Sequence, residues 1–190
     1  MSARLLAIVA AGLVSMGSGL ASAHAGCTPA PRNDCTLPFT SHKSSLTYFQ
    51  TGGHDPDDIY KWRWFHGSST TMASFGTPPA TAYDFCIYDA SPRTQPVVAT
   101  APDDPTGWSA IRTGFGYLER GEHAFRVARL HAGADDKANI QVHGNSDTVT
   151  QVLPFVAPVT VQLQAEGAGC WETDLSTASR SNATTFTARD

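Results

Sequence analysis

The chain has 190 residues, of which 41% are hydrophobic and only 16% are charged, and its formal net charge at pH 7 is -4. This composition excludes a coiled coil, a collagen-like repeat and a highly charged disordered chain. The mild acidity argues against a dedicated nucleic-acid binder, so we expect no nucleic-acid partner.

The first 25 residues have the pattern of a secretory signal peptide. One early cation, Arg4, precedes an apolar run over residues 5–14, and small residues follow up to Ala25. The run is too short to cross a hydrocarbon core of about 30 Å, and no later run reaches about 18 apolar residues. We expect cleavage after Ala23 or Ala25, with residues 1–23 as the minimal signal. The mature chain should have no transmembrane segment and be exported to the periplasm or the medium.

All four cysteines lie in the expected mature chain, at Cys27, Cys35, Cys86 and Cys170. An even number of cysteines in an exported chain indicates disulfides, and no C-x-x-C spacing points to zinc. Three pairings are possible. Closeness in sequence favours Cys27 with Cys35, which leaves Cys86 with Cys170.

Residues 24–45 include a proline-rich stretch without periodicity, which predicts an irregular arm laid on the domain and tied by a disulfide. From residue 46 to residue 190, short segments rich in β-branched and aromatic residues alternate with clusters of Gly, Pro, Asp and Asn. This pattern predicts one all-β domain, a β-sandwich of jelly-roll type. The expected strands are 46–50, 59–65, 82–88, 97–100, 108–113, 124–130, 138–143, 148–153, 159–164, 170–175 and 184–188.

Unbroken alternation marks the segment 159–164 as a strand with two different faces. Val159, Val161 and Leu163 fall on one face, and the three polar residues that alternate with them fall on the other. The segment 82–88 alternates in the same way.

The aromatic segment Tyr60, Trp62 and Trp64 allows two interpretations. If these rings face outward, they form a platform on which a sugar ring can stack. Lys61 and Arg63 would then point inward, and such residues are rarely buried without partners. We therefore favour the register that places the rings in the core and the two cations outside.

Clusters of aspartates suggest a calcium alternative. Asp55, Asp57 and Asp58 form one cluster, and pairs occur at residues 103–104 and 135–136. Calcium takes six to eight oxygen ligands, which such loops can supply. None of the clusters has the spacing of a known calcium loop, and Asp is common in turns because its side chain bonds nearby backbone N–H groups. Solvated turns are the favoured interpretation.

Histidines raise a second metal hypothesis, because cleavage after Ala23 would leave His24 at the amino terminus. Its α-amine and imidazole would together chelate Cu(II), and another histidine would complete the site. This arrangement resembles the histidine brace of copper-dependent polysaccharide monooxygenases, which are also exported β-sandwiches. The other histidines are His42, His54, His66, His123, His131 and His143.

Several segments together resemble a family of uncharacterised exported bacterial proteins. They are Lys61-Trp-Arg-Trp64, Cys86-Ile-Tyr-Asp89 and Cys170-Trp-Glu172, with shared pieces around residues 75–85, 133–142 and 159–163. The resemblance supplies no activity, cofactor or catalytic residue. It adds support to a pairing of Cys86 with Cys170, because both lie in the shared pieces.

Motifs of common enzymes are missing from the sequence. It contains no G-x-S-x-G, no H-E-x-x-H and no P-loop. We therefore expect a non-catalytic accessory or binding protein that engages an envelope or extracellular ligand. The alternative is a secreted metal-dependent enzyme that uses His24 and acts on polysaccharide.

Overall fold

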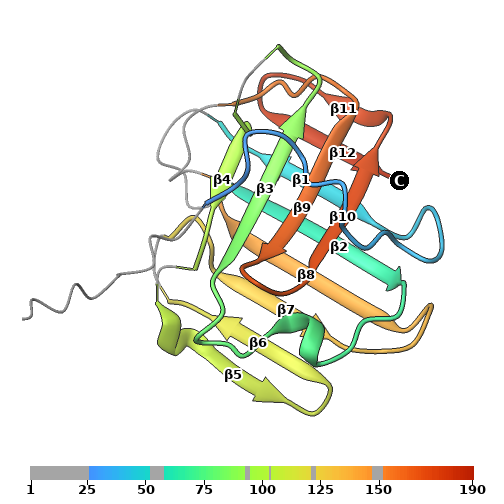
Figure 1. Cartoon of the computed structure of the whole chain (residues 1–190). Helices are drawn as coiled ribbons and strands as arrows, with labels where there is room; N and C mark the ends of the chain where they lie inside the picture. Colours follow the sequence, from blue (N-terminus) through green and yellow to red (C-terminus); the bar gives the residue numbers. More distant parts are fainter. Residues whose placement is uncertain (1–25, 52–57, 93–94, 103, 121–122, 147–151) are drawn as a thin grey trace, which may run out of the picture.

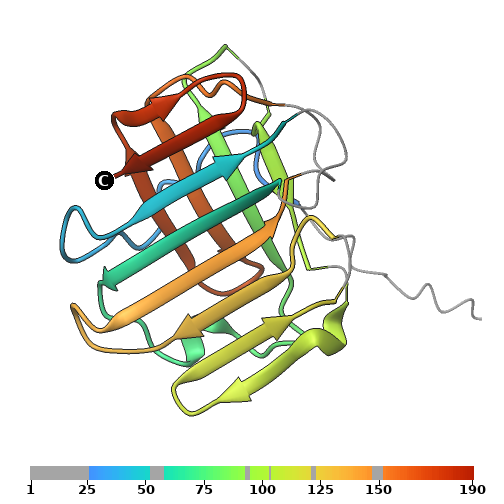
Figure 2. The same ribbon diagram turned by 180° about the vertical axis from the view of Figure 1, so that it is seen from behind.

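A computed structural model describes residues 26–51, 58–92, 95–102, 104–120, 123–146 and 152–190, which form two antiparallel β-sheets. The two sheets pack face to face as a sandwich (Figures 1 and 2). The predicted all-β sandwich is therefore confirmed.

The larger sheet has eight strands in the order β11-β12-β1-β2-β8-β7-β6-β5, and the smaller has four in the order β10-β9-β3-β4. The larger sheet consists of β1 (Ser45–Phe49), β2 (Ile59–Gly67), β5 (Trp108–Ile111), β6 (Gly114–Leu118), β7 (Val127–His131), β8 (Ala138–Asn145), β11 (Ala178–Ser181) and β12 (Thr185–Arg189). The smaller sheet consists of β3 (Tyr83–Asp89), β4 (Val98–Thr100), β9 (Val159–Ala165) and β10 (Cys170–Leu175).

Helical structure within the described ranges is limited to two 3-10 turns, η1 (Ala73–Phe75) and η2 (Pro105–Gly107). Neither these turns nor any other described segment provides a helix that is long and apolar enough to cross a membrane.

The expected strands correspond to observed ones except for 148–153. Residues 147–151 of that segment lie outside the described part of the chain, and Val152 and Leu153 are not in a strand. Two observed strands, β6 and β11, were not predicted. Strand β6 (Gly114–Leu118) contains two glycines, and β11 (Ala178–Ser181) consists of small and polar residues at a sheet edge. Gly and, to a lesser degree, Ala are depleted in strands, so pairing with neighbouring strands is needed to define both segments.

Aromatic side chains from both sheets fill the core. The ring of Tyr60 stacks on that of Phe85, with centroids 5.1 Å apart and planes 6° apart. The indole N–H of Trp62 donates to Thr173 Oγ1 at 3.3 Å, and that of Trp64 donates to the Glu172 carbonyl oxygen at 3.0 Å. These two bonds run from β2 to β10, so they satisfy the buried indole donors and join the sheets.

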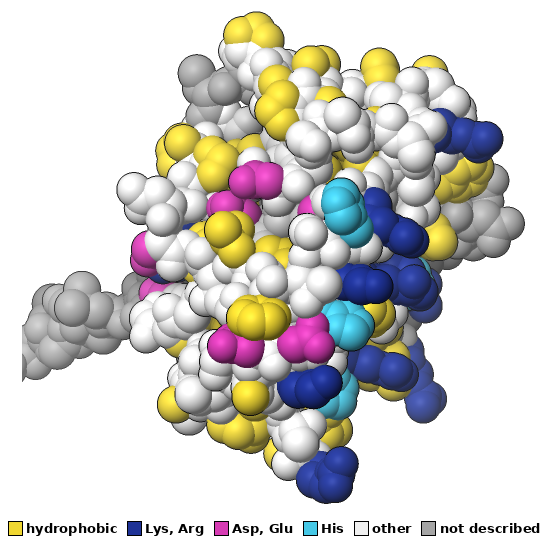
Figure 3. Space-filling view, turned by 90° about the vertical axis from the view of Figure 1, so that its right-hand side faces the viewer, with side chains coloured by type: hydrophobic (Ala, Val, Ile, Leu, Met, Phe, Trp, Pro, Cys, Tyr) yellow, Lys and Arg dark blue, Asp and Glu magenta, His cyan; other side chains and the backbone are white. Residues whose placement is uncertain are grey.

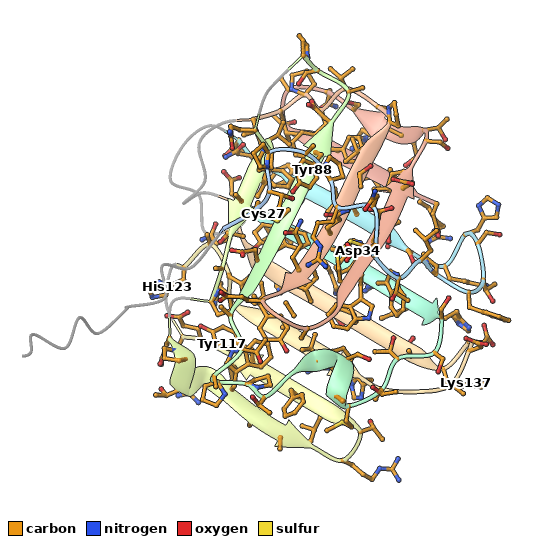
Figure 4. The ribbon with its side chains drawn as sticks, viewed as in Figure 1. Cys27, Asp34, Tyr88, Tyr117, His123 and Lys137 are labelled. Atoms are coloured by element: carbon orange, nitrogen blue, oxygen red, sulfur yellow. A yellow bond between two sulfur atoms is a disulfide. The ribbon has the colours of Figure 1, made fainter. Side chains whose placement is uncertain are left out.

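An N-terminal arm, residues 26–44, crosses the outer face of the smaller sheet in front of β3, β9 and β10 (Figure 1). Thr36 forms a parallel bridge with Trp171, with Thr36 N donating to the Cys170 carbonyl at 2.7 Å. At the other end of the arm, the Tyr88 hydroxyl donates to the Thr28 carbonyl at 2.9 Å, close to Cys27 (Figure 4). The expected irregular arm is present over residues 26–44, whereas Ser45 already belongs to β1 and residues 24 and 25 lie outside the described part of the chain.

All four cysteines form disulfides, but the expected pairing is wrong. Cys27 is bonded to Cys86 and Cys35 to Cys170, with Cα atoms 5.8 and 4.5 Å apart. Cys86 and Cys170 lie on β3 and β10, which β9 separates. Two strand spacings amount to about 9.6 Å, beyond the limit of about 7 Å for a disulfide. Each cysteine of the smaller sheet therefore bonds to a cysteine of the arm. Disulfides of this kind are typical of proteins in oxidising compartments.

The arm also buries the polar face of β9. Gln162 is fully buried, and its amide oxygen accepts from the backbone N–H of Arg32 at 3.1 Å while its Nε2 donates to the Arg32 carbonyl at 2.8 Å. Gln164 Nε2 donates to Gln162 Oε1 at 2.7 Å and to the Tyr88 hydroxyl at 3.2 Å. The predicted division of β9 into two faces is confirmed, with both faces covered.

Candidate binding surface

The aromatic platform considered from the sequence does not exist as an exposed surface. Tyr60, Trp62 and Trp64 have exposed fractions of 0% and belong to the core. Lys61 and Arg63 alternate with them and lie on the outer side of β2. The favoured register is confirmed, and the alternative of a ring-stacking platform is corrected by this burial.

The described aspartates of the three clusters stabilise local structure. Asp58 is fully buried and accepts from the Thr51 backbone N–H at 2.9 Å, and Asp104 accepts from Thr106 N at 2.8 Å. The Asp135 carboxylate accepts from Ser69 N at 2.7 Å, and that of Asp136 accepts from the Thr40 hydroxyl at 2.7 Å. Asp104, Asp135 and Asp136 fit the interpretation as turn residues at the surface, whereas that of a solvated turn is wrong for Asp58, which is buried. Asp55, Asp57 and Asp103 lie outside the described residues.

Metal binding has no candidate cluster in the described ranges, where no three His, Cys, Asp or Glu side chains group together. His66 Nδ1 lies 3.0 Å from Asp136, and His123 Nε2 lies 3.2 Å from Glu119. His24, on which the copper hypothesis depends, lies outside the described residues, as does His54. That hypothesis stays a prediction.

Charge is divided between the two sheets. The eight strands of the larger sheet contain no Asp or Glu, and their Lys and Arg residues are Lys61, Arg63, Arg129, Arg180 and Arg189. The four strands of the smaller sheet contain no Lys or Arg, and their acidic residues are Asp84, Asp89, Glu172 and Asp174. In Figure 3 most Lys, Arg and His side chains gather toward the right of the view, whereas the acidic side chains lie toward its left and centre. An acidic protein thus carries one basic face.

The five cations of the larger sheet form no ion pair with any described residue. The observed pairs involve other groups, such as Arg32 with Asp34 and Lys137 with Asp136. Partial burial, followed by repulsion from Arg63 and Arg129, lowers the pKa of Lys61. The cations therefore repel one another, and no acid of the described residues is paired with them.

Strand register places three of the arginines in one line across the sheet. Arg189 on β12 is opposite Ser45 on β1, which is opposite Arg63 on β2. Arg63 is opposite Gln141 on β8, which is opposite Arg129 on β7. We name these five residues the arginine row. All five lie on the outer face of the sheet, and its three arginines are exposed.

Two shallow hollows lie along the arginine row. The first has a volume of about 450 Å³ and includes Arg189, Ser45 and Arg63 in its lining. The second has a volume of about 310 Å³ and includes Gln141 and Arg129. Hollows on an otherwise convex protein surface bury more of a ligand than a flat face does. Every member of the row therefore borders a hollow.

The arginine row is contacted by one aromatic ring and flanked by two carboxylates. The Arg63 guanidinium carbon lies 5.9 Å from the centre of the Phe65 ring, a cation–π contact that steadies the side chain. At one edge, Asp190 Oδ1 accepts from the backbone N–H of Ser44 at 2.9 Å. At another, Asp136 is occupied by Thr40 and His66. Neither carboxylate forms an ion pair with an arginine of the row.

A half-buried histidine lies beside the row. His143 on β8 is opposite Lys61 and also opposite Val127. Burial first, and then the charges of Lys61 and Arg126, lower the pKa of His143. Its buried Nε2 has no hydrogen-bond partner among the described residues. His143 is therefore a neutral member of the face at neutral pH.

The sequence analysis missed this surface because its residues come from five separate strands. Alternation correctly placed Lys61 and Arg63 outward, which was the only available signal. Arg129 and Arg189 lie 66 and 126 positions beyond Arg63, and only strand order brings them into line.

Comparisons of the chain with family models, with curated proteins and with solved structures each gave no match. The resemblance to exported bacterial proteins stays an expectation. The function of the surface is therefore inferred from its geometry and charge.

Proposed function

We propose that the protein is an exported, non-catalytic binding protein that holds an anionic ligand of the envelope or the extracellular space on the outer face of its larger sheet. The observation that carries this proposal is the separation of charge. The strands of the larger sheet contain no acid and present five cations that form no ion pair with a described residue, in a chain whose net charge is negative.

Composition alone does not explain this separation. A solvated surface of a stable protein commonly mixes both signs of charge, because like charges repel one another. Here the acids of the smaller sheet lie on strands that the N-terminal arm crosses, whereas none of the described segments crosses the cations (Figures 1 and 2). The uncovered face is the one suited to a partner.

Export supports the choice of compartment for the ligand. The two disulfides fit an oxidising environment, and the expected signal peptide would deliver the chain there. Ligands of the envelope and the medium include many polyanions. A neutral glucan lacks the groups that would pair with guanidinium.

Affinity electrophoresis of the purified exported protein tests the proposal. In a gel of low ionic strength, polygalacturonate should retard the protein, and neutral dextran should not. Added salt should abolish the retardation, because screening weakens exposed charge pairs. Migration unchanged by every anionic polymer would overturn the proposal.

A further inference from the structure

The arginine row alternates a charged side chain with a neutral hydrogen-bonding one. Across successive strands it consists of Arg189, Ser45, Arg63, Gln141 and Arg129. Strands lie about 4.8 Å apart, so successive arginines are separated by roughly 9.6 Å. Guanidinium groups bind carboxylates in a bidentate manner, whereas hydroxyl and amide groups bond to neutral hydroxyls. The complementary ligand therefore has a carboxylate on every second unit.

We infer that the arginine row binds a linear acidic polysaccharide with a carboxylate on alternate sugars, placing consecutive carboxylates on Arg189, Arg63 and Arg129. The intervening sugars lie over Ser45 and Gln141. The arginine separation of roughly 9.6 Å is close to the length of two sugar rings in an extended chain. This inference rests on the proposed function and specifies its ligand.

A flexible chain fits the row better than a flat charged surface does. Neighbouring strands are rotated by about 20–25°, so successive arginines differ in direction by roughly 40–50°. A rigid flat surface meets only part of such a row. A glycan chain turns at each linkage and can follow it through both hollows.

Single-stranded nucleic acid fits less well, because the proteins that bind it combine a basic groove with exposed rings on which the bases stack. On β2 the rings of Tyr60, Trp62 and Trp64 are buried, and Phe65 already has Arg63 over its ring. The neutral members of the row carry hydroxyl and amide groups, which suit sugars. The net charge of -4 also disfavours a densely charged polymer.

Hyaluronan oligosaccharides test the inference, because they carry one carboxylate per disaccharide. Calorimetric titration with two, four, six and eight sugars should show affinity that rises to six sugars and then stays constant, since three arginines accept three carboxylates. Each added carboxylate should strengthen binding about two- to fivefold, as expected for an exposed ion pair.

Two single variants at the same edge of the sheet provide a matched comparison. Arg189→Gln on β12 removes the last cation of the row, so constant affinity should be reached at four sugars. Arg180→Gln on β11 removes an equal charge outside the row and should leave the limit at six. Both positions are exposed, and thermal unfolding should show that both variants fold. Arg189→Lys retains the charge without the planar fork and should give an intermediate loss.

The outcomes separate this inference from the proposed function. Affinity for long hyaluronan without any dependence on length, or equal effects of Arg180→Gln and Arg189→Gln, would overturn the row and leave an anion-binding face. Tighter binding of a single-stranded oligonucleotide would overturn the polysaccharide ligand. Failure to bind long hyaluronan or any other polyanion at low salt would overturn both.

Discussion

The outer faces of the two sheets are opposite in charge and in what covers them. The smaller sheet carries acids and buried glutamines, and the disulfide-bonded arm crosses it. The larger sheet carries only cations among its charged strand residues, and no described segment crosses it (Figure 2). One face is therefore covered by the arm, and the other, which no described segment covers, is the face on which we propose that a ligand binds.

This contrast shows that alternation alone does not reveal which polar face is exposed. Gln162 on β9 and Gln141 on β8 both occupy the outer side of a strand, yet Gln162 is fully buried and Gln141 is half-buried. The difference arises from Arg32, whose backbone bonds to the Gln162 amide. Whether the polar face of a strand is exposed therefore depends on the irregular segments that cover it, and sequence patterns describe such segments least well.

The largest expected effect is that of Trp62→Ala, which removes a buried ring of β2 that packs between the two sheets. The free energy of unfolding should fall by about 3–5 kcal/mol, the usual cost of truncating a buried Trp. Urea unfolding measures the loss. Arg63→Gln, one position further along β2, should change stability by less than about 0.5 kcal/mol. Retained stability in Trp62→Ala would contradict the placement of this ring.

Removing one disulfide of the arm should have the next largest effect. In the double variant Cys35→Ser with Cys170→Ser, the free energy of unfolding should fall by about 2–5 kcal/mol. The disulfide between Cys27 and Cys86 closes a shorter loop, so the corresponding double variant should lose less of its free energy of unfolding. Peptide mapping without reductant provides an independent check. A peptide linking Cys27 to Cys35 would contradict the observed pairing.

Gln162→Ala breaks the buried bonds beneath the arm. It leaves the Arg32 N–H and carbonyl without their partner, and we expect a loss of about 1–3 kcal/mol by urea unfolding. Thr160→Ala on the same strand removes an exposed bond to Asp174 and is the matched control, with an effect below about 0.5 kcal/mol. Equal effects would show that the arm does not seal this face.

The smallest expected effect is a dependence of stability on pH at the cationic face. The pKa of His143 is lowered from 6.5 in the folded protein, so the unfolded chain binds this proton more readily. Stability should therefore fall as the pH drops below about 6.5 and level off below the folded-state pKa. The slope must stay below about 1.4 kcal/mol per pH unit, and partial exposure reduces it further. His143→Gln should flatten this part of the profile. An unchanged slope in this variant would contradict the lowered pKa of His143, which burial causes first and the charges of Lys61 and Arg126 second.

Sequence patterns predicted the fold class, the arm, most strands and the orientation of the aromatic residues on β2. Alternation succeeds there because each side chain's direction depends on its own strand. The disulfide pairing failed because it depends on β9 lying between β3 and β10, which is long-range information. The arginine row was missed for the same reason, since Arg63 and Arg129 are aligned only through Gln141 on the intervening β8.

Mapping of backbone amide chemical shifts by nuclear magnetic resonance tests the contrast between the two faces most directly. On titration with hyaluronan hexasaccharide, shifts should change at Ser45, Arg63 and Gln141 on the larger sheet. The amides of Arg32 and Gln162 on the covered face should not respond. Changes concentrated on the arm and the smaller sheet would show that the ligand binds the face that the arm covers. That result would contradict the proposed binding surface on the larger sheet.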